Sequence, residues 1–236
     1  MAALMYVLLL LRCRIVPFGD STWVMFDLKR QYVDFYSYYK RIFGGGEGIL
    51  YSFEAGLGSG MIGFFIYYLA NPLFLLFLPF RTDRLPLAVS FAVGVTIVLA
   101  AVIMAAFLWW YLGKRSTAGG LRRGVTAITG AMAWSFSGFL IAHSMNIMWT
   151  DVVILVPLVI YLVETAFLEG SGNATEQDAP AHGTPYGRRL WYTITITLLL
   201  LFNYYISYQV LLFTALWTLV RLWENRSRKP LRTILS

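Results

Sequence analysis

The chain has 236 residues, of which 58% are hydrophobic and only 13% are charged. Charged residues make up about a quarter of a typical soluble protein, so this composition excludes an ordinary soluble domain. It predicts one all-α polytopic membrane domain over residues 1–236. The net charge of +7 could suggest nucleic acid, but the basic residues stand in short clusters at the ends of apolar runs, as topology signals do. No nucleic-acid partner is therefore expected, and the single cysteine, Cys13, excludes an internal disulfide.

Apolar runs predict the membrane helices in chain order. Residues 1–18 are too short for a full span and fit the outer end of a partial first helix, after which 19–84 form a long loop. Later runs approach the ~20 residues that cross a ~30 Å hydrocarbon core: 85–112, 121–142 and 149–168. The polar, turn-forming segment 169–189 is predicted to be a cytoplasmic linker.

The last apolar region, residues 190–222, is too long for one ordinary span. Its centre is N-Y-Y-I-S-Y at 203–208, and these polar residues predict a break in the helix. We therefore expect two short membrane helices, 190–205 and 206–222, that meet at one face of the membrane.

Residues 61–80 are apolar enough to span, but Gly63 and the Asn71-Pro72 pair interrupt a helix there. If this segment does not span, three loops share one side and carry 11 of the 19 basic residues: 113–123, 169–189 and 221–236. Basic loops are cytoplasmic, so this arrangement predicts that side to be the cytoplasm. Residues 61–80 are then interfacial or re-entrant, and the loop 19–84 is extracytoplasmic.

Asp27 is the first candidate for catalysis in this loop. An aromatic residue precedes it and L-K-R follows it. Apolar surroundings raise a carboxyl pKa and nearby cations lower it again, so such a group can act as a general base. Lys29 and Arg30 are candidate phosphate partners, although basic pairs at a membrane often meet lipid head groups. Asp27 could alternatively cap a helix over residues 28–43.

Helical spacing extends this candidate site. Asp27, Gln31, Asp34 and Tyr38 recur at i, i+4, i+7 and i+11, so a regular helix would place them on one face. Asp34 is therefore a second catalytic candidate, or else a solvated surface charge, and Gln31 is a substrate-binding candidate. Neighbouring tyrosines are expected to anchor the helix at the membrane surface: Tyr32, Tyr36 and Tyr39.

Polar residues between two predicted spans supply further candidates. Asp151 is a third catalytic candidate, and His143 and Asn146 are substrate-binding candidates, because ionisable groups at a membrane boundary are functional hypotheses by default. Asp151 could instead cap the following helix, and His143 could be hydrogen-bonded structure.

Two other regions complete the predicted substrate-binding set. Three residues at the break in the last apolar region could bind a phosphate or sugar, or could satisfy broken backbone: Asn203, Tyr204 and Tyr205. The glycine-rich motif at 51–63 contains Tyr51, Gly56 and Gly58. Its glycines would let a lipid phosphate approach backbone N–H groups, or let helices pack closely.

The order of the motifs resembles a known family. The loop carries D-L-K-R-Q-Y-V-D-F at 27–35, Y-S-F-E-A-G-L-G-S-G-M-I-G at 51–63 and Y-Y-L-A-N-P at 67–72, and later come H-S-M-N-I-M-W-T-D at 143–151 and N-Y-Y-I-S-Y at 203–208. Together they resemble the YfhO family of bacterial membrane proteins, which are grouped with lipid-sugar-dependent glycosyltransferases of the GT-C type.

The resemblance implies a GT-C-like helix bundle in which a polyprenyl-phosphate sugar lies at the outer membrane face. An aspartate of the first outer loop, by motif position Asp27, activates the acceptor. The departures at Thr150 and Ser207, where the family usually has Leu and Gly, remove no catalytic group. Full members of the family are much longer, so the chain is expected to be an N-terminal fragment, completed by a C-terminal half or a partner chain.

We therefore expect a glycosyltransferase of the cell membrane with an extracytoplasmic catalytic face. The expected partners are membrane lipids, the polyprenyl-phosphate donor and a cell-envelope acceptor such as a lipoteichoic acid or another teichoic-type polymer. No cofactor and no metal ligand are predicted, and a need for a divalent metal is left open. One alternative is a non-catalytic lipid-glycan transporter or flippase, but such a protein needs polar groups across the bilayer and the run 85–112 carries no charge. The other alternative is an assembly scaffold.

Overall fold

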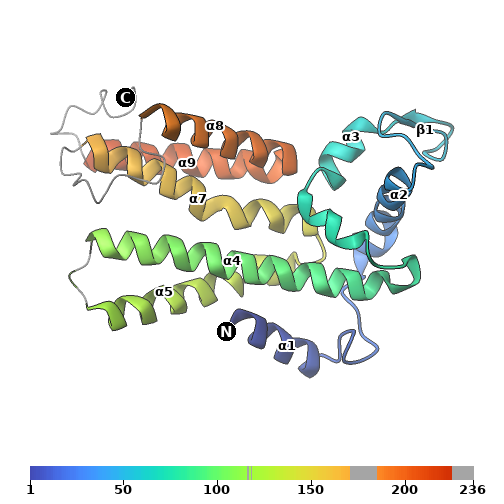
Figure 1. Cartoon of the computed structure of the whole chain (residues 1–236), viewed down its shortest axis with the longest axis horizontal. Coiled ribbons are helices and arrows are strands. Elements are labelled where there is room, and N and C mark those ends of the chain that lie inside the picture. The colour runs from blue at the N-terminus through green and yellow to red at the C-terminus, as the bar shows by residue number, and fades with distance from the viewer. Residues whose placement is uncertain (116, 118, 171–184, 225–236) are drawn as a thin grey trace.

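The computed structural model describes residues 1–115, 117, 119–170 and 185–224 (Figure 1). Its elements in chain order are α1 (Ala2–Arg12), the π-helix η1 (Leu28–Tyr32), α2 (Val33–Phe43), β1 (Tyr51–Ser52), β2 (Ser59–Gly60), α3 (Ile62–Phe64), the π-helix η2 (Phe65–Leu69), the 3₁₀-helices η3 (Pro72–Phe77) and η4 (Thr82–Arg84), α4 (Leu85–Arg115), α5 (Gly120–Ser135), α6 (Gly138–Ala142), α7 (Ile147–Gly170), α8 (Pro185–Phe202) and α9 (Tyr204–Glu224).

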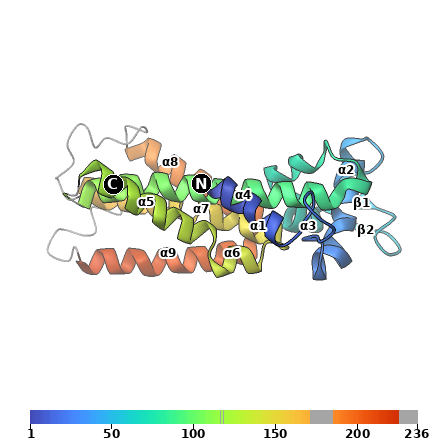
Figure 2. The same ribbon diagram turned by 90° about the horizontal axis from the view of Figure 1, so that it is seen from below.

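Long helices form the body of the molecule and run along its longest axis (Figure 1). In the described residues, four segments are long and apolar enough to cross a membrane: Thr82–Arg115, Gly120–Ala142, Ile147–Phe167 and Tyr204–Glu224. Helix α7 contacts both α8 and α9, and Figure 2 shows these two helices on opposite sides of the bundle. The short antiparallel pair β1–β2 is the only sheet in this part of the chain. The all-α membrane fold predicted from the sequence is confirmed.

The two ends of the bundle differ in composition. Residues 13–84 gather at the end shown on the right of Figure 1, which we call the cap end. The opposite end, which we call the basic end, carries the cations of four helix termini: Lys114, Arg115, Arg122, Arg123, Arg189 and Arg221. Most of the predicted linker 169–189 and the basic residues after Glu224 lie outside the described part of the chain. The side of a membrane that each end faces stays a prediction.

Residues 61–80 fold into short helices at the cap end. None of the candidate spans found in the described chain includes this segment. The Asn71-Pro72 pair ends η2 and begins η3, because Pro72 is suited to a first helical position and the Asn71 side chain accepts a hydrogen bond from the Leu73 backbone N–H at 2.9 Å. The interruption expected at this pair is therefore present.

The apolar region 190–222 is divided at Asn203. Helix α8 ends at Phe202 and α9 begins at Tyr204. The Asn203 side-chain oxygen accepts a hydrogen bond from the Ile206 backbone N–H at 3.0 Å, which satisfies one of the free donors at the start of α9. The polar break therefore joins two antiparallel helices at the cap end, as its position in the sequence suggested.

Helix α1 packs against the first half of α4. The Tyr6 hydroxyl donates to the Ser90 carbonyl oxygen at 2.8 Å and accepts from the Trp23 indole N–H at 3.1 Å. A Cβ atom at Gly94 would lie 2.8 Å from the Tyr6 ring, so only glycine allows the two helices to approach this closely. These contacts hold the entry to the long loop beside α4.

Candidate functional site

Aromatic side chains from four separate segments meet at the cap end. We call this group the aromatic rim, and it consists of Tyr32, Tyr67, Tyr68, Trp149, Tyr204 and Tyr205. They come from η1, η2, the start of α7 and the start of α9. Ring contacts therefore join parts of the chain that are more than a hundred residues apart.

The contacts within the aromatic rim are close. The Tyr68 ring centroid lies 5.5 Å from that of Tyr32 and 4.6 Å from that of Tyr67. Tyr67 continues the group, because its ring lies 5.5 Å from Tyr204 and its hydroxyl accepts from the Trp149 indole N–H at 3.4 Å. Such pairs contribute stability beyond their buried area, so η2 is held against both α7 and α9.

Asp27 lies beside this rim with an exposed side chain. Burial raises the pKa of the Tyr32 phenol, and the nearby Asp27 carboxylate raises it further. Burial also raises the pKa of Tyr68, and Tyr67 and Asp27 add to that effect. The Asp27 carboxylate makes no hydrogen bond or ion pair with any residue that the structure describes, so its oxygens are open to a ligand.

The helix cap considered for Asp27 is wrong. Its backbone is already helical, with φ −64° and ψ −30°, and its side chain makes no capping hydrogen bond. A capping residue has non-helical dihedrals, so that its side chain can reach the first N–H groups. The helical turn begins before Asp27, so Asp27 does not occupy the position from which a side chain caps the first N–H groups.

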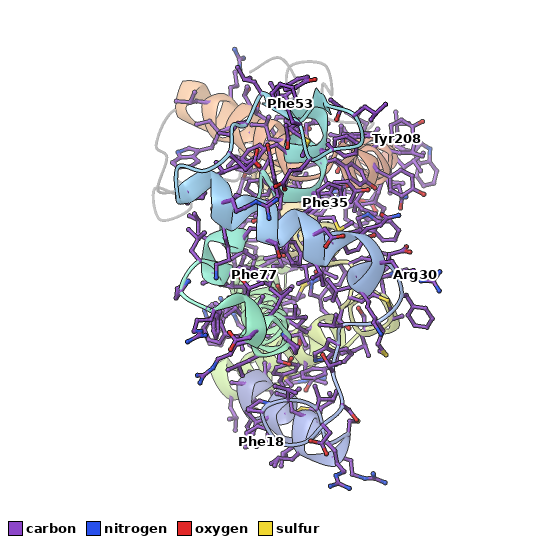
Figure 3. The ribbon with its side chains drawn as sticks, turned by 90° about the vertical axis from the view of Figure 1, so that its right-hand side faces the viewer. Phe18, Arg30, Phe35, Phe53, Phe77 and Tyr208 are labelled. Carbon is purple, nitrogen blue, oxygen red and sulfur yellow. The ribbon has the colours of Figure 1, made fainter. Side chains whose placement is uncertain are left out.

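Basic side chains near Asp27 divide into two groups. Lys29 and Arg30 are exposed, and Arg30 extends away from the body of the molecule in Figure 3. Lys40 donates to the Phe80 carbonyl oxygen, and Arg41 pairs with Glu54. Of the cations along this helix, Lys29 and Arg30 are therefore the ones available to a phosphate beside Asp27.

The expected common face of Asp27, Gln31, Asp34 and Tyr38 is not formed. The helix opens with the π-helix η1, whose wider turn rotates all later positions around the axis. Asp34 and Tyr38 line a cavity on the side of the β1–β2 hairpin, whereas Asp27 lies near Tyr32 and Tyr68. Gln31 is exposed. The two catalytic candidates of this helix therefore face different surroundings.

The tyrosines expected to anchor α2 at the membrane surface are instead part of the core. Tyr32, Tyr36 and Tyr39 are all buried. The Tyr36 ring lies 5.1 Å from Phe74 and 4.6 Å from Phe77. Anchoring was a wrong interpretation, because η3 supplies an apolar partner for this face of the helix that a single surface helix would lack.

His143 and Asn146 lie at the edge of the aromatic rim. The Asn146 side-chain nitrogen is 3.3 Å from the His143 Nδ1. The His143 ring is 5.3 Å from Trp149 and 4.6 Å from Phe139. His143 is half-buried and Asn146 is buried, so Asn146 orients the imidazole and its burial contradicts a direct role in substrate binding.

Asp151 lies inside the bundle and not at a helix start. Its side chain is 2% exposed, and α7 begins one turn earlier, at Ile147, so capping is wrong for this residue. The carboxylate accepts hydrogen bonds from the Asn71 side-chain amide and from the Thr96 hydroxyl, the latter at 3.4 Å. It therefore ties the long loop and α4 to α7, and its burial contradicts a direct role on a substrate at the surface.

Asn203 and the glycine motif also have structural roles. Asn203 is wholly buried and caps α9, which contradicts its assignment to substrate binding, whereas Tyr204 and Tyr205 are exposed on the rim. Gly58 has φ +105°, and a Cβ atom there would lie 2.1 Å from the Tyr51 hydroxyl. Gly56, with φ +66°, lines the same cavity as Asp34. The hairpin residues are therefore grouped with Asp34 and not with Asp27.

An apolar cavity of about 540 Å³ begins next to the rim. Phe139, which contacts His143, and Ile206, two residues after Tyr204, line the part nearest the cap end. Tyr111 and Trp217 line the part nearest the basic end. Ile206 and Trp217 are eleven residues apart on α9, or about 16 Å along the axis, so the cavity follows the direction of a lipid chain in a bilayer.

The comparisons with known proteins give one family. The profile described as bacterial membrane protein YfhO matches residues 1–173. The chain belongs to the YfhO family. No curated protein and no solved structure matches it. The YfhO match includes Asp27, η2 and the turn at His143, and it ends before α8, so Tyr204 and Tyr205 lie outside it.

Several residues of this YfhO-family site were missed by sequence reasoning. Tyr67, Tyr68 and Trp149 lie inside motifs that carry the family resemblance, yet nothing in their spacing indicates that they converge. Asn71 was interpreted only as a helix interruption, and its hydrogen bond to Asp151 joins residues 80 positions apart. In the described residues, no group of three or more His, Cys, Asp or Glu side chains could hold a metal ion.

Proposed function

We propose that this YfhO-family chain carries the donor site and the catalytic base of a GT-C type glycosyltransferase, which moves a sugar from polyprenyl phosphate to an extracytoplasmic cell-envelope glycan, such as a teichoic-type polymer. The observation that supports it most is the exposed Asp27 carboxylate, which has no partner among the described residues and lies beside the aromatic rim. Catalytic carboxylates need such access to a substrate hydroxyl.

The cap end faces the outside of the cell in this proposal. The cations of four helix termini lie at the basic end, and basic loops remain in the cytoplasm during membrane insertion. Asp27, His143 and the aromatic rim then stand at the outer boundary of the bilayer, where a lipid-linked sugar presents its phosphate.

The reaction is a displacement at the anomeric carbon of the donor sugar. Asp27 accepts the proton of an acceptor hydroxyl, and the acceptor oxygen forms a bond to the anomeric carbon. The bond from that carbon to the phosphate oxygen breaks, and its electron pair leaves with the polyprenyl phosphate. Lys29 and Arg30 stabilise the negative charge of the departing phosphate.

The apolar cavity beside the rim supports a lipid-linked donor. Its walls are almost wholly apolar, and it extends from Ile206 toward Trp217 within the bundle. A prenyl chain can leave the bilayer for this cavity without exposing apolar surface to water, because both surroundings are apolar. The phosphate at the head of that chain would then lie next to Tyr204 and Tyr205, on the aromatic rim beside which Asp27 lies.

The test is the Asp27→Asn variant of the full-length protein. We expect it to fold and insert normally, because Asp27 is exposed and makes no capping bond. Its rate of transfer should fall by about 10²–10⁴-fold, since general-base catalysis typically contributes that much. The assay follows radiolabelled sugar from polyprenyl phosphate into a glycan acceptor in detergent micelles.

The matched control is Asp20→Asn, because Asp20 is another exposed carboxylate of the same loop and forms no ion pair with a described residue. The control should transfer at the parental rate. Near-parental transfer by Asp27→Asn would contradict the proposal, and so would an equal loss in both variants.

A further inference from the structure

A second cavity at the cap end lies between α2 and the β1–β2 hairpin. Its volume is about 670 Å³, within the roughly 300–1,000 Å³ of small-molecule sites. The side chains that matter for its chemistry are two carboxylates, one guanidinium, one free hydroxyl and two phenyl rings: Asp34, Glu54, Arg41, Ser59, Phe35 and Phe64. The reaction described above uses none of these residues.

The polar groups favour a ligand that donates hydrogen bonds. Asp34 makes no hydrogen bond or ion pair with a described residue, so both of its oxygens can accept. Glu54 is paired with Arg41. The two carboxylates, Asp34 and Glu54, and the Arg41 guanidinium together carry a formal charge of −1. A phosphate would meet this net negative charge and Asp34 directly, so the cavity favours a neutral ligand rich in hydroxyl groups.

An aromatic wall closes one side of the cavity. The Phe35 and Phe64 rings are stacked, with centroids 5.6 Å apart and an angle of 23° between their planes. Figure 3 shows Phe35 near the middle of the cap end. Weakly positive C–H groups, such as those on one face of a pyranose ring, pack on the negative face of an aromatic ring. A cavity lined by both carboxylates and an aromatic pair therefore suits a sugar.

The same wall leads to the catalytic group. Phe35 stacks on Tyr68 with centroids 4.4 Å apart and an angle of 13°. Tyr68 belongs to the aromatic rim. Burial is the largest cause of its raised pKa, Tyr67 is the next, and Asp27 is close enough to contribute as well. Asp34 lies seven residues after Asp27, on the far side of the π-helix η1. A short glycan can follow this wall from one carboxylate to the other.

We propose that the cavity between α2 and the β1–β2 hairpin binds a neutral sugar unit of the acceptor glycan. Asp34 accepts hydrogen bonds from neighbouring hydroxyls of that unit, and Phe35 and Phe64 pack on its apolar face. The next unit of the glycan then reaches Asp27 along Tyr68. This inference rests on the proposed function and narrows its acceptor to a cell-envelope glycan with neutral sugar units, because the phosphate units of a teichoic backbone would be repelled by the net negative charge of the cavity.

Direct binding tests the cavity without any transfer. Saturation-transfer NMR on the purified full-length protein uses cellobiose, maltose and lactose as neutral probes and glycerol phosphate as the anionic probe. We expect at least one disaccharide to bind and glycerol phosphate not to bind. Asp34→Asn should weaken disaccharide binding about 10-fold or more, because a charge-assisted hydrogen bond is lost. Phe64→Leu should weaken it as well, and Asp20→Asn should not.

Kinetics separate the cavity from the catalytic residue. Asp34→Asn should raise the KM for the acceptor with little change in kcat, whereas Asp27→Asn should lower kcat and keep disaccharide binding. The inference is overturned if glycerol phosphate competes with the disaccharides, or if both Asp34→Asn and Phe64→Leu bind them as tightly as the parent. If Asp27→Asn still transfers while Asp34→Asn loses disaccharide binding, the catalytic proposal fails and the cavity assignment stands.

Discussion

Glu164 joins three helices near the basic end, and replacing it by Gln should destabilise the bundle. Its side chain is 1% exposed. One carboxylate oxygen accepts from the Trp217 indole N–H at 2.9 Å and lies 2.9 Å from the Arg221 Nε, and the other lies 3.2 Å from a terminal nitrogen of Arg115. Through these contacts α7 is tied to both α4 and α9.

The expected cost of Glu164→Gln follows from what each partner keeps. Removing one member of a buried ion pair costs about 3–5 kcal/mol. Arg221 retains Glu224 as a second carboxylate, and the Arg115 side chain is 40% exposed and therefore hydrated. Gln can still accept from Trp217. We therefore expect a loss of about 2–3 kcal/mol in the free energy of unfolding, below the full penalty of an isolated buried charge.

The assay is unfolding in mixed detergent micelles as the fraction of denaturing detergent rises, followed by tryptophan fluorescence and by circular dichroism. Glu224→Gln is the matched control, because it belongs to the same cluster but its side chain is 49% exposed. The control should cost less than about 1 kcal/mol. Equal losses in the two variants, or a loss below 1 kcal/mol for Glu164→Gln, would refute the reasoning.

Further predictions concern the cap end. Tyr36→Phe should stabilise the protein by about 1 kcal/mol, because the fully buried Tyr36 hydroxyl has no hydrogen-bond partner among the described residues; a lower midpoint of thermal unfolding would contradict this. The double variant Lys29→Gln, Arg30→Gln should raise the KM for the lipid donor, and an unchanged KM would remove these cations from the phosphate site. A cysteine placed at Glu47 should react with an impermeant reagent added outside intact cells and one at Thr175 should not, and the reverse pattern would invert the topology.

The membrane helices were predictable because length and hydrophobicity determine them locally. The uncharged run that became α4 needs no partner to be recognised, and the break between α8 and α9 follows from Asn203, whose side-chain oxygen caps the start of α9. Helix ends differ from the prediction by a few residues, as at Pro185 for α8, because the basic end of a helix continues into water.

The candidate site was harder to predict because its geometry depends on contacts between distant segments. The π-helix η1 rotates Asp34 away from Asp27, and no glycine or proline marks that wide turn. Asp151 resembles a helix cap in the sequence, but in the structure its buried carboxylate accepts a hydrogen bond from Asn71, which is 80 residues away. Spacing within one helix shows which residues share a side, and only the neighbouring chain decides whether that side is a surface.

The unequal lengths of the helices determine how a lipid would meet the site. Helix α4 has 31 residues, about 46 Å at 1.5 Å per residue, so it is about 16 Å longer than a ~30 Å hydrocarbon core. Helix α8 has 18 residues, about 27 Å, and ends where it meets η2, whereas α4 continues farther along the cap end (Figure 1). The bundle is therefore stepped at the cap end, and Tyr204 and Tyr205 of the aromatic rim stand on the lower step, which the proposed orientation places at the outer boundary of the bilayer. A donor dissolved in the outer leaflet would arrive sideways by two-dimensional diffusion, so the transfer rate should follow its mole fraction among the membrane lipids and not its amount per volume of solution.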